Sequence, residues 1–315
     1  MPICSIIITT RNRADSLRRT LDSLAGLTMP GEVQVEILVV DNGSTDRTAG
    51  VVEEARRSDP RIRYLAEPHP GQSRARNAGL RAVASEAVVF IDDDVQIASP
   101  QSWLSQLCGP ILAGLADAAA GAVRVAPSLC RPWMTAFHRS LLASTERQEA
   151  GGPVELVGAN MAFARRVLER VPGFDEELGP GALGFGDDSL FSWQLVEAGY
   201  RLTSAFDAVV EHHPDPRRLT RAALLEAARA FGRTRGYYQY HWLHERLGMK
   251  GLHALKRPLR LWWTRLRRRP WREPEGAPQW ELELLADICA LRYFVAQTIL
   301  RRPRKYARRG LVKRT

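Results

Sequence analysis

Three consecutive aspartates, Asp92, Asp93 and Asp94, directly follow the apolar run 87–91 and carry the strongest chemical signal in this sequence. In an extended chain Asp92 and Asp94 lie on the same side. Carboxylates placed in this way can share a hard divalent cation, which in turn holds the phosphates of a substrate. The alternative is a solvated turn at the end of a strand. The pattern therefore makes these residues candidates for a metal site and leaves the turn open.

A second group of polar residues lies at the ends of two other apolar runs and near the start of a helix. Thr9 lies near the end of the first run and Arg11 directly after it, and Asp41 ends the second run, ahead of the turn Asn42-Gly43-Ser44. A carboxylate at Asp41 can accept hydrogen bonds from a base or a ribose, or it can cap the next helix. Arg74 lies at a predicted helix start, where it either meets an anion together with backbone amides or faces solvent.

A third group combines glycine, acidic residues and histidines. Gly186 and Asp187 precede the helical pattern 188–198, and Asp188 opens it. Glycine lets the backbone lie close to a ligand, while the helix dipole alone would explain two acids at this position. His212 and His213 end a predicted strand, and one of them is either structural or a third ligand of the metal site.

The hydrophobic pattern predicts the elements that position these residues. Apolar runs predict strands at 3–10, 36–41, 62–66 and 87–91, separated by helical patterns over 17–24, 45–57 and 73–84. Such alternation is typical of a parallel, doubly wound α/β sheet. Ligands bind at the carboxyl ends of the strands in these sheets. The polar groups are therefore expected to meet at one edge.

Beyond residue 100 the alternation is lost. The sequence predicts a helix over 103–115, a strand over 119–125, an irregular segment over 127–152, a strand, turn and strand over 154–163, and a strand over 202–210. From residue 220 onward helical patterns dominate.

The charge of the chain is unevenly distributed. Its 315 residues carry a net charge of +10, but residues 1–249 carry −3 and residues 250–315 carry +13. A basic segment of this kind calls for a polyanionic surface, either anionic lipid or nucleic acid.

Composition excludes several classes of protein. With 45% hydrophobic and 25% charged residues, the chain is not disordered, collagen-like or a coiled coil. No run approaches the ~20 apolar residues of a membrane span, and no signal peptide is recognisable. The four cysteines have no metal or redox spacing, which favours reduced thiols in a cytoplasmic protein.

Taken together and in order, these segments resemble the family 2 glycosyltransferases, which have the GT-A fold. The matching segments are SIIITTRNR, ILVVDNGSTDRT, GQSRARNAGL, VVFIDDDV, GAN at 158–160, PGFDEEL at 172–178 and GDDSLFSWQLVEAGY at 186–200. They cover residues 3–213, about two thirds of the chain. The resemblance implies an α/β fold of GT-A type over 1–215, with a Rossmann-like nucleotide-binding half (1–98) and an acceptor half (99–215). A helical, basic region (216–315) follows.

The resemblance also implies roles for individual residues. Those expected around the donor nucleotide are Thr9, Arg11, Asp41, Arg74, Asp92 and Asp93. Asp94 would bind Mn²⁺ or Mg²⁺, with His212 or His213 nearby. Asp188 would be the catalytic base, and Asn160, Asp187 and Gly186 would lie near the donor sugar and the acceptor.

The function that this resemblance implies is metal-dependent, inverting sugar transfer. The donor would be a nucleoside diphosphate sugar, with UDP favoured, and the acceptor a hydroxyl of a saccharide or a lipid-linked molecule. The setting would be bacterial polysaccharide, glycolipid or glycoconjugate synthesis. Two alternatives are a phosphohydrolase of the haloacid dehalogenase type, because VVFIDDDV also resembles its hhhDxDx[VT] strand, and a catalytically inactive module that binds nucleotide sugars.

The region after residue 215 lies outside the resemblance and interleaves aromatic with basic residues, most densely in RPLRLWWTRLRRRPW at 257–271. This composition favours a helix on the surface of an anionic membrane. The alternatives are helix packing over the catalytic domain and, less favoured, RNA binding through stacking aromatics. The chain is accordingly expected in the cytoplasm, either free or on the inner face of the cell membrane.

Overall fold

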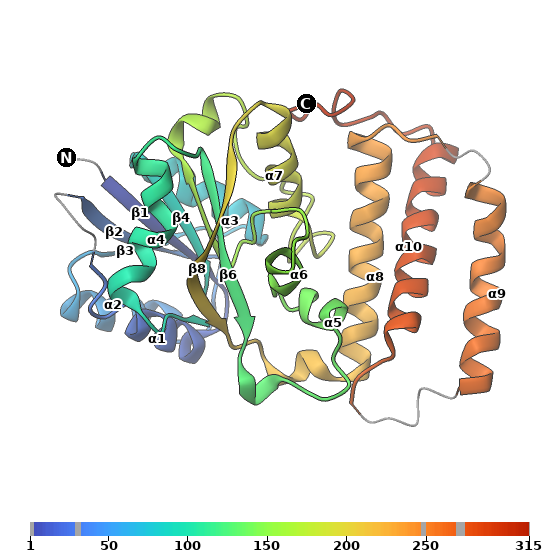
Figure 1. Ribbon diagram of the computed structural model, residues 1–315, viewed down its shortest axis with the longest axis horizontal. Coiled ribbons are helices and arrows are strands. Elements are labelled where there is room, and N and C mark those ends of the chain that lie inside the picture. Colours follow the sequence, from blue (N-terminus) through green and yellow to red (C-terminus); the bar gives the residue numbers. More distant parts are fainter. Residues whose placement is uncertain (1–2, 29–32, 247–249, 269–274, 315) are drawn as a thin grey trace.

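One mixed sheet of eight strands forms the centre of the α/β part, and a layer of long helices lies to one side of it (Figure 1). The computed structural model describes residues 3–28, 33–246, 250–268 and 275–314. The strand order in the sheet is β3-β2-β1-β4-β7-β6-β8-β5.

The first half of the sheet is parallel, as the sequence predicts. Its strands are β1 (Ile3–Thr10), β2 (Gln34–Asp41), β3 (Ile62–Ala66) and β4 (Ala87–Asp92), linked by the helices α1 (Ala14–Ser23), α2 (Thr48–Ser58) and α3 (Gln72–Ala82). β1 lies between β2 and β4, and its β-branched residues Ile6, Ile7 and Ile8 are fully buried. A strand covered on both faces needs such a continuous apolar run.

The second half of the sheet is mixed. β7 (Asn160–Ala164) runs antiparallel to β4, followed by β6 (Ala118–Val125), β8 (Leu202–His212) and the short β5 (Val95–Gln96). The predicted strand, turn and strand over 154–163 is wrong in its first part, because residues 154–159 form no strand. The remaining elements of this half are α4 (Pro100–Leu112), η1 (Pro127–Leu129), α5 (Ala136–Ser140), α6 (Glu146–Glu149), η2 (Arg165–Glu169) and α7 (Asp187–Glu197).

β8 is irregular in its middle. Gly121 of β6 pairs with Ala205, but the next residue, Ala122, pairs with Val209, so residues 206–208 have no partner in β6. Beyond this bulge β8 continues to His212, which pairs with Val95 of β5. The pairing brings the end of β8 next to the residues that follow β4.

The helical layer consists of α8 (Arg221–Tyr237), the π-helix η4 (Tyr238–Trp242), α9 (Lys250–Arg268) and α10 (Gln279–Ile299), after the short η3 (Pro216–Leu219). In Figure 1, α8 lies nearest the sheet and α9 farthest from it, with α10 between them. The prediction that this region is helical is confirmed. None of the helices in the described ranges combines the length and the hydropathy that crossing a membrane requires.

The segment after α10 returns to the α/β part and runs along α7 (Figure 1). Gln194 of α7 donates a hydrogen bond to Leu311 O over 2.9 Å, and Trp242 donates one to Gly310 O over 2.9 Å. The hydroxyl of Tyr306 donates to the buried Asp175 over 2.8 Å. The helical layer is therefore fastened to the α/β part by its own C-terminal segment.

Candidate active site

The strand register brings the polar strand ends together. β1 pairs Thr9 with Asp92 of β4 and Thr10 with Asp41 of β2, so the carboxyl ends of three parallel strands adjoin. Thr10 also donates a hydrogen bond to Asp93 over 2.7 Å. The predicted convergence at one edge of the sheet is confirmed.

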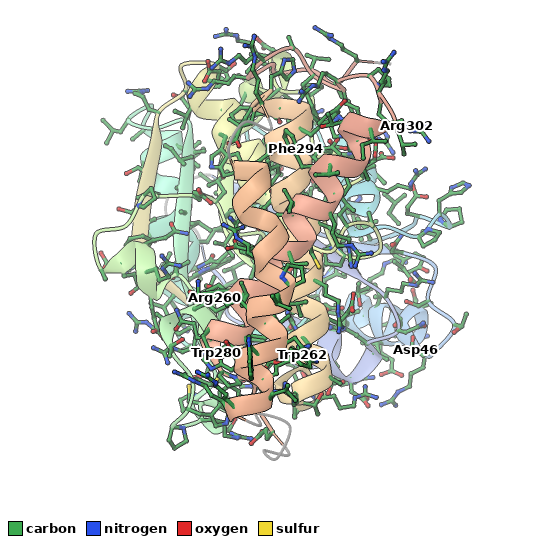
Figure 2. All side chains as sticks on the ribbon, turned by 90° about the vertical axis from the view of Figure 1, so that its right-hand side faces the viewer. Asp46, Arg260, Trp262, Trp280, Phe294 and Arg302 are labelled. Atoms are coloured by element: carbon green, nitrogen blue, oxygen red, sulfur yellow. The ribbon has the colours of Figure 1, made fainter. Side chains whose placement is uncertain are left out.

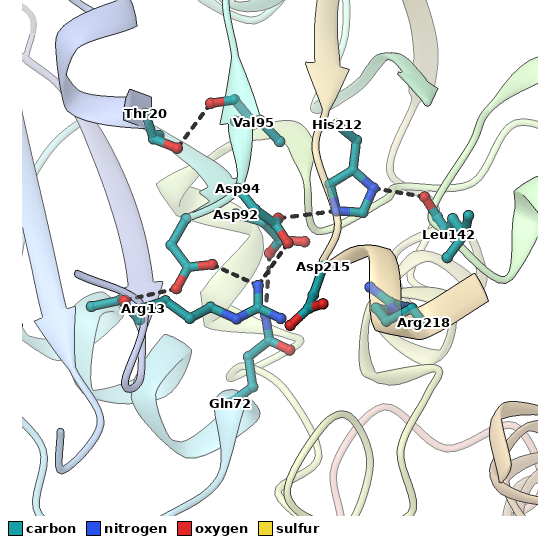
Figure 3. Close-up of polar contacts among 12 residues, drawn as sticks. Arg13, Thr20, Gln72, Asp92, Asp94, Val95, Leu142, His212, Asp215 and Arg218 are labelled. Carbon is teal, nitrogen blue, oxygen red and sulfur yellow. Dashed lines mark hydrogen bonds and ion pairs between the residues drawn. The ribbon is translucent and has the colours of Figure 1, made fainter. Parts of the chain in front are cut away.

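Asp92, Asp94 and His212 form a compact group at this edge (Figure 3). Each offers one ligand atom, and these atoms lie within 4.8 Å of one another. The group depends on the pairing of β5 with β8, which sets His212 beside Asp94. His213 points elsewhere, with its Nε2 2.7 Å from Glu211. Of the two histidines that the sequence left open, His212 lies in this group and His213 does not.

The hydrogen bonding of His212 suits a metal ligand. Its Nδ1 lies 2.7 Å from Leu142 O, so this nitrogen carries the proton, and Nε2 faces Asp94 Oδ1 at 3.0 Å (Figure 3). A backbone carbonyl that fixes the tautomer in this way is a common support for a ligating histidine. Asp94 Oδ1 is buried and forms no hydrogen bond among the described residues.

The electrostatics of the group agree with this geometry. Burial would lower the pKa of His212, but the charge of Asp94, its close contact with the ring and the charge of Asp92 together raise it. Burial would likewise raise the pKa of Asp94, but His212 and Arg13 hold it well below its usual range. A carboxylate that stays ionised, a second carboxylate and an imidazole nitrogen together fit a divalent cation.

A basic residue that the sequence reasoning missed lies against the aspartates. Arg13 Nη1 is 3.0 Å from Asp93 and 2.6 Å from Asp94. Arg11, which the sequence predicted, is exposed at the same edge. Arg13 lies two residues after Arg11 in the motif TTRNR, and this spacing could have identified it as a second basic residue of the site.

A small cavity of about 230 Å³ opens between these strand ends. Its lining includes six of the predicted site residues: Thr9, Arg11, Asp92, Asp93, Asp94 and His212. Asp41 does not line it, because its carboxylate is buried and accepts hydrogen bonds from Ser44 N over 2.8 Å and Tyr64 OH over 2.9 Å. Asn42 lines the cavity instead.

The predicted Arg74 also lies outside this cavity, and Arg76 takes the inner position. Arg74 is half-exposed and pairs with Glu176 over 3.0 Å. Arg76 is 3% exposed, and its guanidinium lies 2.6 Å from Asp187 and 3.4 Å from Asp92. Gln72, one helical turn before it, donates a hydrogen bond to Asp92 over 3.1 Å. The spacing of four residues between Gln72 and Arg76 could have identified this inner face of α3.

A larger cavity of about 530 Å³ adjoins the small one, and Asp188 lines it. Asp188 accepts hydrogen bonds from Gly158 N over 2.9 Å and Ser189 N over 2.8 Å, which hold its carboxylate in place. Burial raises the pKa of Asp188 to about 6, and the neighbouring Asp187 adds to this effect. Asp187 itself is buried and bound to Arg76 and Ser73.

The backbone at Gly186 brings this acidic pair close to α8. Gly186 has a φ of +87°, in the left-handed region that favours glycine. Its carbonyl oxygen accepts a hydrogen bond from Tyr238 at the end of α8. A side chain at this position would overlap Tyr238 and Thr234. The loop before Asp188 is therefore held directly against the helical layer.

Asn160 does not reach either cavity. It is fully buried in β7, where it donates hydrogen bonds to Ala122 O and Ala208 O and accepts one from Trp103. Asn160 was expected near the donor sugar and the acceptor, but its polar atoms bind the backbone of the sheet and Trp103 and face neither cavity.

The two cavities meet at the candidate metal group. Both are lined by Gln72, Asp92, Pro180, His212 and Arg218. Arg218, in η3, is a further residue that the sequence reasoning missed, because it lies beyond the segment of family resemblance (Figure 3). A bound molecule in the small cavity and another in the large one would approach each other at Asp92.

A Rossmann-like sheet whose strand ends present an Asp-x-Asp pair, joined to a second cavity, defines the class of GT-A glycosyltransferases. Residues 5–171 match the sequence model of Glycosyl transferase family 2, so the chain belongs to this family. The resemblance that the motifs imply is confirmed.

Curated relatives are similar over about two thirds of the chain. The pre-mycofactocin glycosyltransferase of Mycobacterium tuberculosis is 31% identical over 217 residues, which are 66% of this chain and 42% of that protein. Glycosyltransferase AglE of Haloferax volcanii is 27% identical over 223 residues, or 69% of this chain and 68% of that protein. The chain thus spans less than half the length of the pre-mycofactocin enzyme.

Among solved structures, the mannosyltransferase PcManGT of Pyrobaculum calidifontis in complex with GDP-Man and Mn²⁺ is similar in fold. Its TM-score is 0.58 and its sequence identity 22%, over 95% of this chain and 74% of that one. The likeness confirms the GT-A fold.

Proposed function

We propose that this protein transfers a sugar from a nucleoside diphosphate sugar to a hydroxyl acceptor, with inversion at the anomeric carbon and with the help of a divalent cation. The observation that carries the proposal is the position of Asp92, Asp94 and His212 between two adjoining cavities. The small cavity suits the nucleotide diphosphate, and the large cavity, which Asp188 lines, suits the acceptor.

The residues of the donor side suit an anionic leaving group. Asp92, Asp94 and His212 would hold Mn²⁺ or Mg²⁺, which supplies charge neutralisation for the departing diphosphate. The imidazole nitrogen favours Mn²⁺ over Mg²⁺, which prefers oxygen ligands. Arg218 adds a positive charge where the two cavities meet.

The residues of the acceptor side suit proton removal. Asp188, held by two backbone amides, takes the proton of the acceptor hydroxyl while the oxygen of that hydroxyl forms a bond to the anomeric carbon. The bond from that carbon to the diphosphate oxygen breaks in the same step. One displacement inverts the anomeric centre, whereas a two-step covalent route would retain its configuration.

The relatives support the class of donor. PcManGT is described with GDP-Man and Mn²⁺, and TarS of Staphylococcus aureus, similar in fold at a TM-score of 0.50, with UDP. We favour UDP for this chain on the strength of the family resemblance. The acceptor is a saccharide or lipid-linked hydroxyl in polysaccharide, glycolipid or glycoconjugate synthesis, at the inner face of the cell membrane where the acceptor is lipid-linked.

Calorimetric titration of UDP and GDP, each with and without Mn²⁺, tests the donor side. We expect Mn²⁺ to strengthen UDP binding in the natural protein. Asp94→Ala should weaken the Mn²⁺-dependent part by roughly 10–100-fold or more, since even residues that merely support a metal ligand have effects of that size. The matched control is His213→Ala, because this side chain pairs with Glu211 and does not face the metal group.

Unchanged Mn²⁺-dependent affinity in Asp94→Ala would refute the metal assignment. Release of phosphate from a phosphate monoester, without binding of any nucleoside diphosphate, would favour the phosphohydrolase. Donor binding without hydrolysis of the nucleotide sugar or transfer to any acceptor would favour the inactive binding module.

A further inference from the structure

The side of α9 that faces away from the rest of the protein carries an apolar stripe. Leu259, Trp262, Trp263 and Leu266 follow the spacing i, i+3, i+4 and i+7, which places them on one side of a helix. They are 62, 57, 53 and 44% exposed. Figure 2 looks onto this side, with α9 towards the viewer and Arg260 and Trp262 labelled on it. We refer to these four residues as the outer stripe.

The opposite side of α9 is bound to α10, which fixes the orientation of the outer stripe. Leu261 is buried in the hydrophobic cluster between the two helices. Arg265 Nε lies 2.6 Å from the fully buried Glu281, and Arg257 Nη1 lies 3.2 Å from Asp287. The outer stripe is therefore directed outward by specific contacts, and within the described ranges it remains exposed.

The charged residues of α9 itself are all basic. Residues 250–268, which form α9, contain seven basic residues and no acidic residue. Arg260 and Arg267 are exposed beside the stripe, and the guanidinium of Arg267 lies 5.0 Å from the ring centre of Trp263. Residues 269–271, the end of the motif RPLRLWWTRLRRRPW, lie outside the described residues.

We propose that α9 docks the protein on an anionic membrane surface. The outer stripe enters the boundary between headgroups and acyl chains, while Arg260 and Arg267 contact lipid phosphates. This docking goes beyond sugar transfer and requires neither nucleotide nor metal.

A lipid surface fits these residues better than two other partners. Leu259 and Leu266 cannot stack on bases, whereas they suit acyl chains, which argues against RNA. Four partly exposed side chains are also few for a stable dimer, which buries about 800 Å² on each partner. The alternation of apolar and basic groups across one helix is the pattern of an interfacial helix.

The proposed docking helix is connected to the larger cavity. Asp287 of α10 binds Arg257 of α9 through one oxygen and Arg235 of α8, at 2.9 Å, through the other. Arg235 lines the larger cavity together with Phe231, Thr234 and Tyr238. The docking helix α9 is thus linked through Asp287 of α10 to Arg235 in the wall of the acceptor cavity.

Cosedimentation with vesicles tests the docking. Vesicles of phosphatidylcholine mixed with phosphatidylglycerol should bind the full-length protein, and binding should fall as salt screens the charges over roughly 10 Å at 0.1 M. Arg260→Gln combined with Arg267→Gln should weaken binding by roughly fivefold for each arginine. Trp262→Ser combined with Trp263→Ser should weaken it by about tenfold or more, since each ring buries a large apolar area.

The matched control is Leu115→Ser combined with Val196→Ser, which removes two exposed apolar side chains far from α9 in sequence. It should bind vesicles as the natural protein does, and circular dichroism should show all variants folded. Equal binding to vesicles of phosphatidylcholine alone would overturn the electrostatic part of the proposal. Unchanged binding in both α9 variants would overturn it entirely. So would binding to RNA but not to vesicles, or a dimer that the tryptophan variant converts to monomers without any vesicle binding.

Discussion

Asp188 combines a fixed position with a raised affinity for protons. Two backbone amides orient its carboxylate, and burial raises its pKa to about 6. A general base acts in its deprotonated form, so in the proposed role Asp188 would be mostly competent at neutral pH and would become inactive as the pH falls below about 6. A base with a pKa close to the working pH accepts a proton more readily than an ordinary carboxylate does.

Replacing Asp188 by asparagine keeps the shape of the side chain and removes its basicity. In Asp188→Asn we expect the transfer rate to fall by roughly 10²–10⁴-fold while UDP affinity changes little, because this residue lines the acceptor cavity. The transfer rate of the natural enzyme should fall in acid, with a midpoint near pH 6. The residual activity of the variant should not show this fall. Transfer rates across pH and calorimetric UDP affinity provide the two readouts.

Full activity in Asp188→Asn would reduce this residue to a structural role at the start of α7, since asparagine caps helices about as well as aspartate. An acid limb that persists in the variant would assign the titration to another group.

At the same scale, sequence reasoning identified the types of residue better than their exact positions. The three aspartates were found because they follow an apolar strand. The sequence cannot show which of Arg74 and Arg76 is buried, because both lie in the first turns of one helix. Only the packing of α3 against Asp187 makes Arg76 the buried arginine and leaves Arg74 half-exposed. The role of Asn160 in joining strands of the sheet could not be predicted, because its three hydrogen bonds link segments distant in sequence.

At the scale of elements, the pairing of α8 with α10 depends on two glycines. A side chain at Gly236 would place its Cβ 2.6 Å from Ala290 O and 2.8 Å from Tyr293 Cβ. A Cβ added at Gly232 would likewise lie too close to Ala286 O. The helices therefore approach closely because these positions have no side chain, and the wall of the larger cavity depends on that approach.

We expect Gly236→Ala to destabilise the protein by about 1–3 kcal/mol, the usual cost of forcing an extra group into a packed interface. Thermal unfolding should record a lower Tm. Gly50→Ala is the matched control: Gly50 is also helical, but nothing lies within 4 Å of its added Cβ. That variant should be as stable as the natural protein or slightly more stable. Equal Tm values for the two variants would show that the close approach is not needed.

The elements were predictable where one local signal dominated. β1, β2 and β4 each contain a continuous run of four or more buried apolar or small residues, which a strand buried on both faces requires. The segment 127–152 gave no periodic signal, although it contains α5 and α6, because helices of four or five residues bury too little to leave a pattern. The pairing of the two-residue β5 with β8 depends entirely on tertiary contacts.

At the scale of the whole molecule, one buried carboxylate joins the helical layer and the C-terminal segment to the α/β part. Asp175 precedes α7 in the chain and accepts hydrogen bonds from Tyr237 of α8 and from Tyr306, and it pairs with Lys313. Burial would raise the pKa of Asp175, but Lys313 and Tyr237 lower it, so the carboxylate stays charged. Three segments distant in sequence thus share one anion.

Tyr306→Phe removes one of these donors and leaves the ring in place. We expect a loss of about 1.5–3 kcal/mol of stability, the usual contribution of a hydrogen bond to a charged group. Tyr200→Phe is the matched control, since its hydroxyl makes a longer bond of 3.3 Å to Arg166 O. Chemical denaturation compares the two variants, and an equal midpoint for both would argue that Asp175 does not hold the C-terminal segment.

The number of residues in the bulge of β8 determines which histidine reaches the candidate metal group. Side chains on a strand alternate between its faces, and an odd number of extra residues, 206–208, reverses that alternation relative to β6. Counting every second residue from the start of β8 therefore assigns the wrong face to its end. Ala208, Val210 and His212 are buried, while His213 follows the strand and lies against Glu211. The length of this irregular segment thus determines which histidine lies beside Asp92 and Asp94, and a shift of a single residue there would exchange His212 for His213.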